Sequence, residues 1–168
     1  MAISTKSMGD TENLQLATFV VGRFFFGIDV LNVQEVLRFQ RMTRVPLAPP
    51  VIVGLINLRG QIVPALDMRR RLYLDPRTPE ERPMNLVVRT EDGAVSLLVD
   101  EIGDVLEVNP SAFENTPANV ASNVRDMIRG VYKLRNRLLF VLDTEKTVDI
   151  SWTIPVLKTA GQPLETHS

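Results

Sequence analysis

The sequence VIVGLINLRGQIVPALDMRRRL, residues 51–72, contains two apolar runs separated by a short polar tip. Residues 52–56 are apolar on both faces, which is typical of a strand buried on two sides. Residues 62–68 alternate between two faces and so predict a second strand. We therefore predict a β-hairpin whose tip carries Asn57 and Arg59.

Two residues refine this hairpin. Gly60 can adopt the positive φ angle that a tight turn needs. Pro64 has no N–H to donate to a neighbouring strand, so we expect the second strand to lie at a sheet edge or to contain a bulge. An edge strand offers unpaired backbone groups, and the hairpin therefore predicts a surface that binds a partner.

The composition sets limits on the class of protein. The chain has 168 residues, 45% of them apolar, which is enough for one ordinary domain or two small lobes. Nineteen Lys and Arg against twenty Asp and Glu argue against a surface dedicated to nucleic acid or anionic lipid. There is no cysteine, and the single histidine, His167, is next to last. We therefore predict no metal site and no cofactor.

The two ends of the chain differ in pattern from its middle. We expect a disordered N-terminus at 1–13, a single domain at 14–150 and a loose C-terminal tail at 153–168. No run approaches the roughly 20 apolar residues of a membrane span, and the N-terminus lacks the apolar core of a secretion signal. We therefore expect a cytoplasmic protein. Inside the domain, the charged and proline-rich residues 75–83 predict an exposed connector.

The first part of the domain predicts a hairpin followed by a helix. Residues 14–30 form two apolar runs around a turn at Gly22-Arg23. After Asp29, a candidate N-cap, apolar residues recur at helical spacing, and we expect a short helix over 30–38.

Two further hairpins are predicted in the second part. One lies at 86–99 across Asp92-Gly93, which is a strong hairpin signal. The other lies at 130–142, and one or two helical turns are expected before it, near 120–128.

The chain also contains an internal repeat. Adding 76 to positions in the 51–72 hairpin maps it onto the last predicted hairpin, and adding 69 maps the segment after Asp29 onto residues 99–106. The matched pairs include Gly54 and Gly130, Leu58 and Leu134, Arg59 and Arg135, Asp67 and Asp143, Val33 and Ile102, Glu35 and Asp104, and Val36 and Val105. The repeat predicts a mainly β protein of two similar lobes, each a five-stranded small β-barrel, centred on 14–72 and 84–148.

The sequence offers little to an enzyme. Asp67, Asp100 and Asp143 end apolar strands and are candidates for acid–base or metal chemistry, but the first and last suit a turn or a helix N-cap instead. Motifs for a nucleophile, for zinc or for a phosphate loop are absent, so we predict no catalytic residues. The basic run 69–71 leaves a small-barrel nucleic-acid binder as an alternative, although most aromatic residues lie in apolar strands.

Glu35 and Arg59 each interrupt an apolar neighbourhood. One interpretation is that they pair in a groove between the lobes, whose apolar rim of Val33, Val36 and Val105 receives a partner helix. The other is an exposed ion pair worth roughly 0–1 kcal/mol and without function. The residues by themselves leave both interpretations open.

Five segments follow one another in an order typical of a known family. They are Val33–Leu37, Gly54–Gly60, Val63–Arg69, Val99–Leu106 and Leu138–Asp143. They resemble the CheW family of bacterial chemotaxis coupling proteins, and the similarity extends over about 14–148. The run Asn-Leu-Arg-Gly, followed by a proline-containing strand that ends in Asp, is the most specific signal. The resemblance implies two five-stranded barrels, Src-homology-3-like or OB-like, formed by tandem duplication with partly exchanged strands.

The resemblance also implies a function. A CheW-like protein is an adaptor without enzyme activity, which holds the regulatory domain of the histidine kinase CheA to the cytoplasmic tips of methyl-accepting chemotaxis receptors. It would be recruited to receptor arrays at the inner face of the membrane, with no cofactor, no nucleic acid and no insertion into the bilayer. A regulatory module of a CheA-like kinase is the alternative within the same fold.

Functional positions of the family transfer residue by residue. The resemblance implies a receptor-binding groove at Val33, Glu35, Gly54, Arg59, Ile102 and Val105, to which the pattern of the chain adds Val36 and Asn57. A receptor tip is a helical hairpin, so an apolar groove with a fixed polar pair suits it. Kinase-binding positions do not transfer in this way, and we expect the hydrophobic positions Ile62 and Leu66 to contribute to that surface.

Overall fold

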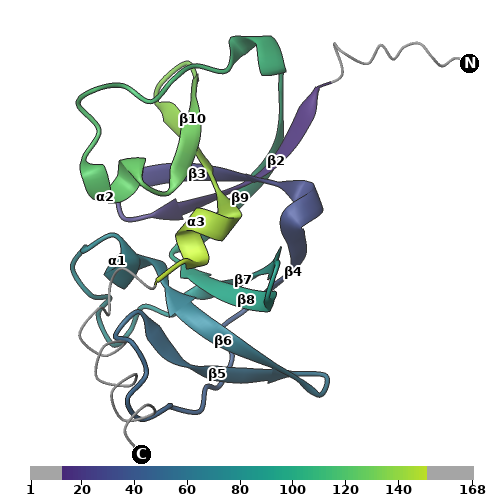
Figure 1. Cartoon of the computed structure of the whole chain (residues 1–168), viewed down its shortest axis with the longest axis vertical. Helices are drawn as coiled ribbons and strands as arrows, with labels where there is room; N and C mark the ends of the chain where they lie inside the picture. The colour runs from purple at the N-terminus through teal and green to yellow at the C-terminus, as the bar shows by residue number, and fades with distance from the viewer. Residues whose placement is uncertain (1–12, 151–168) are drawn as a thin grey trace, which may run out of the picture.

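The computed structural model describes residues 13–150 and shows two lobes along the long axis of the molecule, each built on one β-sheet (Figure 1). The tails expected at 1–13 and 153–168 lie, apart from residue 13, outside the described residues. The mainly β class and the two five-stranded sheets are as predicted.

Ten strands and five short helices make up the described chain. The strands are β2 (Leu14–Val21), β3 (Phe24–Asp29), β4 (Val33–Leu37), β5 (Ile52–Leu58), β6 (Gln61–Asp67), β7 (Met84–Thr90), β8 (Gly93–Val99), β9 (Glu101–Val108), β10 (Ile128–Lys133) and β11 (Leu138–Leu142). The α-helices are α1 (Met68–Arg71), α2 (Ser122–Arg125) and α3 (Thr144–Val148), and the 3-10 helices are η1 (Val30–Asn32) and η2 (Pro110–Ala112). The predicted hairpins and the helical turn near 120–128 are all present.

The two halves of the chain exchange strands. The first sheet has the order β10-β11-β3-β2-β9 and the second the order β4-β7-β8-β6-β5. Each half therefore supplies its leading hairpin to one sheet and its other three strands to the other sheet. The segments 14–72 and 84–148 each contribute to both lobes, because neither half completes a sheet by itself, and this is the partial strand exchange that the family resemblance implied.

The repeat found in the sequence is present in the strand register. Gly54 pairs with Ala65 after a bulge in β5, and Gly130 pairs with Val141 after the equivalent bulge in β10. The parallel pairings and the bulged edge pairings of the two sheets also correspond under the offsets of 76 and 69. The duplication is therefore a property of the backbone and not only of the composition of the strands.

A short bridge helps to close each sheet into a barrel-like lobe. Thr43, after β4, exchanges two backbone hydrogen bonds of 2.8 Å with Leu55 on β5, at the opposite edge of the second sheet. Glu114, after β9, does the same with Val131 on β10 at 2.9 Å. The strand edges are thus partly covered by the chain's own loops, which limits unwanted edge pairing.

The apolar side chains form three clusters. One draws only on the first sheet, around Leu16 and Leu139, and a second only on the second sheet, around Ile56 and Val63. The largest cluster contains residues of both sheets, including Phe26 of β3 and Leu66, Leu86 and Leu97 of the second sheet. This shared core fixes one lobe against the other.

The helix expected over 30–38 is wrong. The chain makes one 3-10 turn at Val30–Asn32, capped by the Asp29 carboxylate, and then continues as the edge strand β4. A bulge between Val33 and Glu35 places two residues of β4 against one of β7. The bulge interrupts the two-residue alternation of a strand, and this produced the helix-like spacing of apolar residues.

We expected β6 to be an edge strand or to contain a bulge, but it lies between β5 and β8, and the bulge in the β5–β6 pair lies in β5, between Ile52 and Gly54. Pro64 faces Leu55, which uses both its N–H and its C=O to bond Thr43, so this pair has no hydrogen bond to lose. On the other side, the ladder to β8 begins only at Ala65. Proline is therefore tolerated inside the sheet at this one position.

The paired glycines give a stability prediction. A Cβ at Gly54 would lie 2.9 Å from the Cβ of Met42 and 3.0 Å from the Thr43 carbonyl oxygen, and a Cβ at Gly130 would lie 2.5 Å from the Glu114 carbonyl oxygen. We expect Gly54→Ala and Gly130→Ala each to lower the free energy of unfolding by about 1–3 kcal/mol in urea titrations.

The control for this prediction is Gly27→Ala. Its nearest contacts are leucine side-chain atoms at 3.2 Å, which can shift more easily than backbone. A Gly54→Ala protein as stable as Gly27→Ala would show that the closing loop does not constrain β5.

Candidate functional site

The charged pair expected at the hairpin tip is formed. The Arg59 guanidinium donates to the Glu35 carboxylate, which joins the β5–β6 turn to β4 at the other edge of the second sheet. The Arg59 side chain is 71% exposed and that of Glu35 is 20% exposed. The pair therefore lies at the surface, where its direct contribution to stability is small, but it fixes the position of the tip.

The apolar residues that were predicted to line a groove lie on two edge strands, one in each sheet. Val33 of β4 and Ile102 of β9 both pack against the shared core cluster. Val36 and Val105 are 40% and 57% exposed on the same two strands. Under the repeat, Val33 is equivalent to Ile102 and Val36 to Val105. Each lobe therefore contributes one aliphatic residue that packs on the core and one that is exposed.

The other two predicted groove residues have structural roles. Asn57 is exposed, and its side-chain oxygen accepts a hydrogen bond of 2.9 Å from the Gly60 N–H, which stabilises the turn. Arg59 and Gly60 both have positive φ angles in this turn. Gly54 is buried beneath Met42 and Thr43, so its absent side chain makes room for the closing loop rather than for a partner.

The two positions expected to contact a kinase differ from each other. Ile62 is 58% exposed on β6 next to the hairpin tip. Leu66 is 1% exposed and belongs to the shared core, so it presents no surface to a partner, and its assignment is corrected. Ile62 and Leu66 are four residues apart and so lie on the same face of β6, but Ile62 is next to the exposed tip whereas Leu66 is covered by the shared core.

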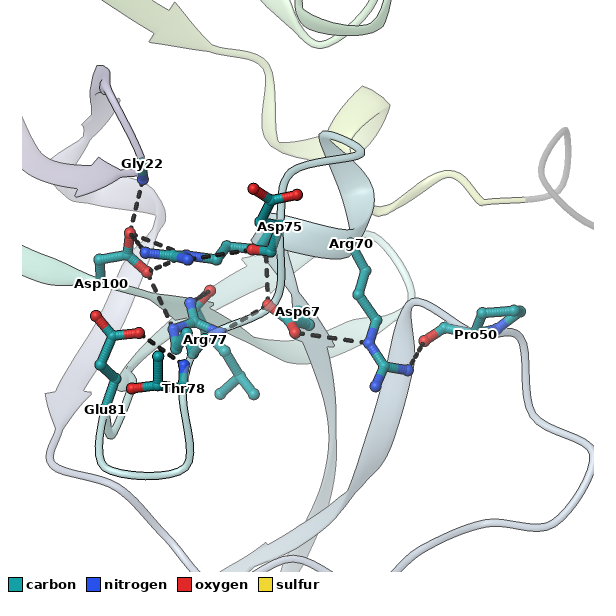
Figure 2. A network of polar contacts seen from close by, with 11 residues as sticks. Gly22, Pro50, Asp67, Arg70, Asp75, Arg77, Thr78, Glu81 and Asp100 are labelled. Carbon is teal, nitrogen blue, oxygen red and sulfur yellow. Dashed lines mark hydrogen bonds and ion pairs between the residues drawn. The ribbon is translucent and has the colours of Figure 1, made fainter.

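A network of charged residues between the lobes was not predicted (Figure 2). Asp100 lies where the chain leaves β8 for β9, and its carboxylate accepts 2.6 Å from the Gly22 N–H in the β2–β3 turn. It also accepts from Arg69 of α1, at 2.9 Å from Nη2 and 3.0 Å from Nε. Asp100 thus links the β2–β3 turn of the first sheet to helix α1, which directly follows strand β6 of the second sheet.

A second arginine completes the network. Arg77, in the 75–83 connector, donates 3.0 Å to Asp100, 2.9 Å to the Asp67 carboxylate and 3.1 Å to the Leu98 carbonyl. Its side chain is only 9% exposed, although the composition of the connector predicts exposure throughout. Burial raises the pKa of the Asp100 carboxyl, but the hydrogen bonds from Arg69 and Gly22 and the charge of Arg77 outweigh it, and the pKa lies below its ordinary value.

The basic run 69–71 faces mostly inward. Arg71 is 1% exposed and donates to the Thr147 and Lys146 carbonyl oxygens at the end of α3, at 2.9 and 3.0 Å. Arg69 is 18% exposed in the network, so only Arg70 is half-exposed, at 53%. Two of the three arginines therefore hold the lobes together, which removes the run as a nucleic-acid surface.

The three strand-ending aspartates have structural partners. Asp67 caps α1 and Asp143 caps α3, as their positions predicted, and Asp100 is surrounded by arginines. Within the described part of the chain, His, Asp and Glu side chains do not gather in a group of three able to hold a metal ion. Over residues 13–150, every helix is too short or too polar to cross a bilayer.

These features define a protein of two exchanged β-lobes whose distinctive surface is an apolar region with a fixed ion pair, as in an interaction module. Residues 15–151 match the model of the CheW-like domain, and the chain belongs to this family. Membership makes it a chemotaxis coupling protein, or scaffold.

Similar proteins agree with this assignment. The chain is 33% identical to the chemotaxis protein CheW of Bacillus subtilis (strain 168) over 135 residues, which cover 80% of this chain and 86% of the relative. It is 30% identical to the chemotaxis protein CheW of Klebsiella aerogenes over 146 residues, or 87% and 88% of the two chains. The scaffolding protein TtCheW from Thermoanaerobacter tengcongensis has the same fold, with a TM-score of 0.70 at 23% identity over 78% of this chain and 89% of that one.

The network between the lobes predicts an acid-sensitive contribution to stability. Because the folded-state pKa of Asp100 is depressed, its contribution is complete above the unfolded pKa of about 3.9 and is lost as the pH falls through the lower folded value. We expect Asp100→Asn to lower the free energy of unfolding by about 1–3 kcal/mol at pH 7. The measurement is urea unfolding at pH 7 and at a series of acidic pH values.

The difference between the two proteins should begin to shrink below about pH 4, where this carboxyl becomes protonated in the unfolded chain, and it should disappear as the pH falls through the lower folded pKa. Asp92→Asn, at an exposed hairpin turn, is the matched control. A difference that stays constant down to the lowest pH would show that the charge of Asp100 does not stabilise the junction.

Proposed function

We propose that this chain couples chemotaxis receptors to the histidine kinase CheA by binding both proteins at once, without catalysing a reaction. The observation that supports this most directly is the Glu35–Arg59 pair beside exposed aliphatic residues. We assign the receptor contact to Val33, Glu35, Val36, Asn57, Arg59, Ile102 and Val105. Gly54 supports that surface from below by admitting the closing loop.

The physical properties of this surface suit a helical hairpin. An amphipathic helix presents an apolar stripe along one side, and the exposed Val36 and Val105 offer aliphatic contact to such a stripe. Arg59 is largely exposed but held in one place by Glu35, so little side-chain entropy is lost when it meets a polar group of the partner.

The kinase contact is proposed for the exposed end of the second lobe. Ile62 is a large aliphatic side chain that is 58% exposed beside the hairpin tip, and regulatory domains of CheA are themselves expected to resemble this fold. Two modest affinities on one protein would be amplified in an array in which many copies are held close together. Such binding would recruit the protein to the inner face of the membrane through the receptors.

Arg59→Glu tests the receptor contact. The substitution places two carboxylates together at the tip, and we expect affinity for a purified receptor signalling-tip fragment to fall about tenfold, which is about 1.4 kcal/mol. Because the pair is exposed, the thermal midpoint should change little. Isothermal titration calorimetry measures the affinity.

The equivalent substitution Arg135→Glu in the first lobe is the control and should leave receptor affinity within twofold. The exchanged pair Glu35→Arg with Arg59→Glu restores an ion pair of opposite orientation. Recovery of binding would indicate that the pair only shapes the tip, whereas continued loss would indicate that Arg59 contacts the receptor. Unchanged affinity in the single variant contradicts the proposed groove.

Ile62→Glu tests the kinase contact. A charge at this exposed aliphatic position should weaken binding to a purified CheA regulatory domain by at least fivefold, because it would have to be desolvated in the interface. Receptor affinity should remain, since the Glu35–Arg59 pair is intact. If kinase binding is unaffected and Arg59→Glu still impairs receptor binding, the kinase surface lies elsewhere and the receptor assignment is retained.

A further inference from the structure

A second exposed surface lies on the loop between β4 and β5 and is not used by the groove. Leu47 in this loop is 88% exposed, and Tyr73, just after α1, is 67% exposed. Arg70 lies between them, because it lines hollows next to both and its guanidinium donates 2.8 Å to the Pro50 carbonyl (Figure 2). We call this surface the loop face.

Both apolar side chains are held in a strained backbone. Leu47 has a φ of 65° and Tyr73 a φ of 59°, in the left-handed region that large side chains rarely adopt. Tyr73 follows the C-cap of α1, where the Tyr73 and Leu74 N–H groups bond the Arg70 and Arg69 carbonyls, a position at which glycine is usual. Strain of this kind at exposed apolar residues is typical of binding sites rather than of scaffold positions.

The loop is rigidly attached at its two ends. Thr43 exchanges two hydrogen bonds with Leu55, and Arg70 holds Pro50, while prolines at 46, 49 and 50 restrict the backbone between them. The hollow that the loop encloses has a volume of about 920 Å³ and is lined by apolar residues together with Arg41, Arg44 and Arg70. A preformed surface of this kind loses little conformational entropy on binding.

The charge of the loop face selects its partner. Residues 36–66 contain four arginines and no acidic residue. Among residues 13–150, no carboxylate forms an ion pair with Arg41 or Arg44. Unpaired arginines beside exposed apolar side chains complement carboxylates beside an apolar anchor.

We propose that the loop face docks an acidic amphipathic segment of a partner protein, with the apolar side chains of that segment against Leu47 and Tyr73 and its carboxylates against Arg41 and Arg44. The chain's own residues 151–168 are a poorer match, because they contain one glutamate and one lysine. This proposal does not depend on the receptor or kinase assignment, since it uses none of their residues.

The test uses the full chain and a fluorescein-labelled peptide with leucine at positions i, i+3, i+4 and i+7 and glutamate elsewhere. Its partner peptide carries lysine in place of each glutamate. We expect the acidic peptide to bind at least tenfold more tightly than the basic one by fluorescence anisotropy, with affinity that falls as salt is added. Equal affinity for the two peptides would overturn the proposal.

Variants locate the contact. Arg41→Glu combined with Arg44→Glu should reduce affinity for the acidic peptide at least tenfold, whereas Arg135→Glu in the first lobe should not. Leu47→Asn and Tyr73→Gly place residues that tolerate positive φ at the strained positions, so they should weaken peptide binding several-fold without lowering the thermal midpoint. A lowered midpoint with unchanged peptide affinity would mean that these residues are structural.

Nuclear magnetic resonance of the ¹⁵N-labelled chain separates the remaining outcomes. Peptide-induced shifts should centre on residues 41–47 and Tyr73 and spare the Glu35–Arg59 pair. Shifts confined to that pair would assign the acidic peptide to the groove and overturn the proposal. If a chain ending at Ile150 shows shifted Leu47 and Tyr73 signals without any peptide, the occupant is the chain's own tail and the partner assignment fails.

Discussion

The structure depends on one constraint, which is that neither half of the chain can complete a sheet. The chain crosses between the lobes at η1, before β4, and again at Asp100, before β9. Val33 and Ile102 lie on the strands that begin just after these two crossings, and both pack on the shared core. The lobes therefore cannot move apart without exposing that core, and the topology keeps the two strands in a fixed relation to each other.

Much of this fold could be predicted from the sequence because its signals are local. Glycine and Asp-Gly turns mark the hairpins, and coincident glycine, arginine and aspartate residues mark the repeat. The errors occurred where a local pattern has two physical causes. The bulge in β4 produced helical spacing, and Pro64 suggested an edge although its neighbour Leu55 bonds a third segment. The bulge becomes apparent only when β4 is paired with β7, and the place of Pro64 only when the bonds between Leu55 and Thr43 are known.

Only part of the candidate site could be predicted from the sequence. Glu35 and Arg59 stood out as charges that interrupt apolar runs, and they form a pair. The network around Asp100 gave no comparable signal, because its arginines come from the basic run and from a connector whose composition is typical of an exposed loop. The prediction that Leu66 lies on a binding surface was wrong for a simpler reason. An alternating strand has two faces, and the sequence did not show that both are covered here.

The two copies of the repeat differ in the charged side chains at their hairpin tips. Arg135 and Asp104 occupy the positions equivalent to Arg59 and Glu35, yet among residues 13–150 neither of them forms an ion pair. Aspartate is one methylene shorter than glutamate, and the backbone carbonyl of Asp104 accepts instead from the Thr18 hydroxyl. The same backbone thus carries a fixed charged tip in one lobe only. Because the backbone register is the same in both lobes, the difference between the two tips lies in their side chains and not in the fold.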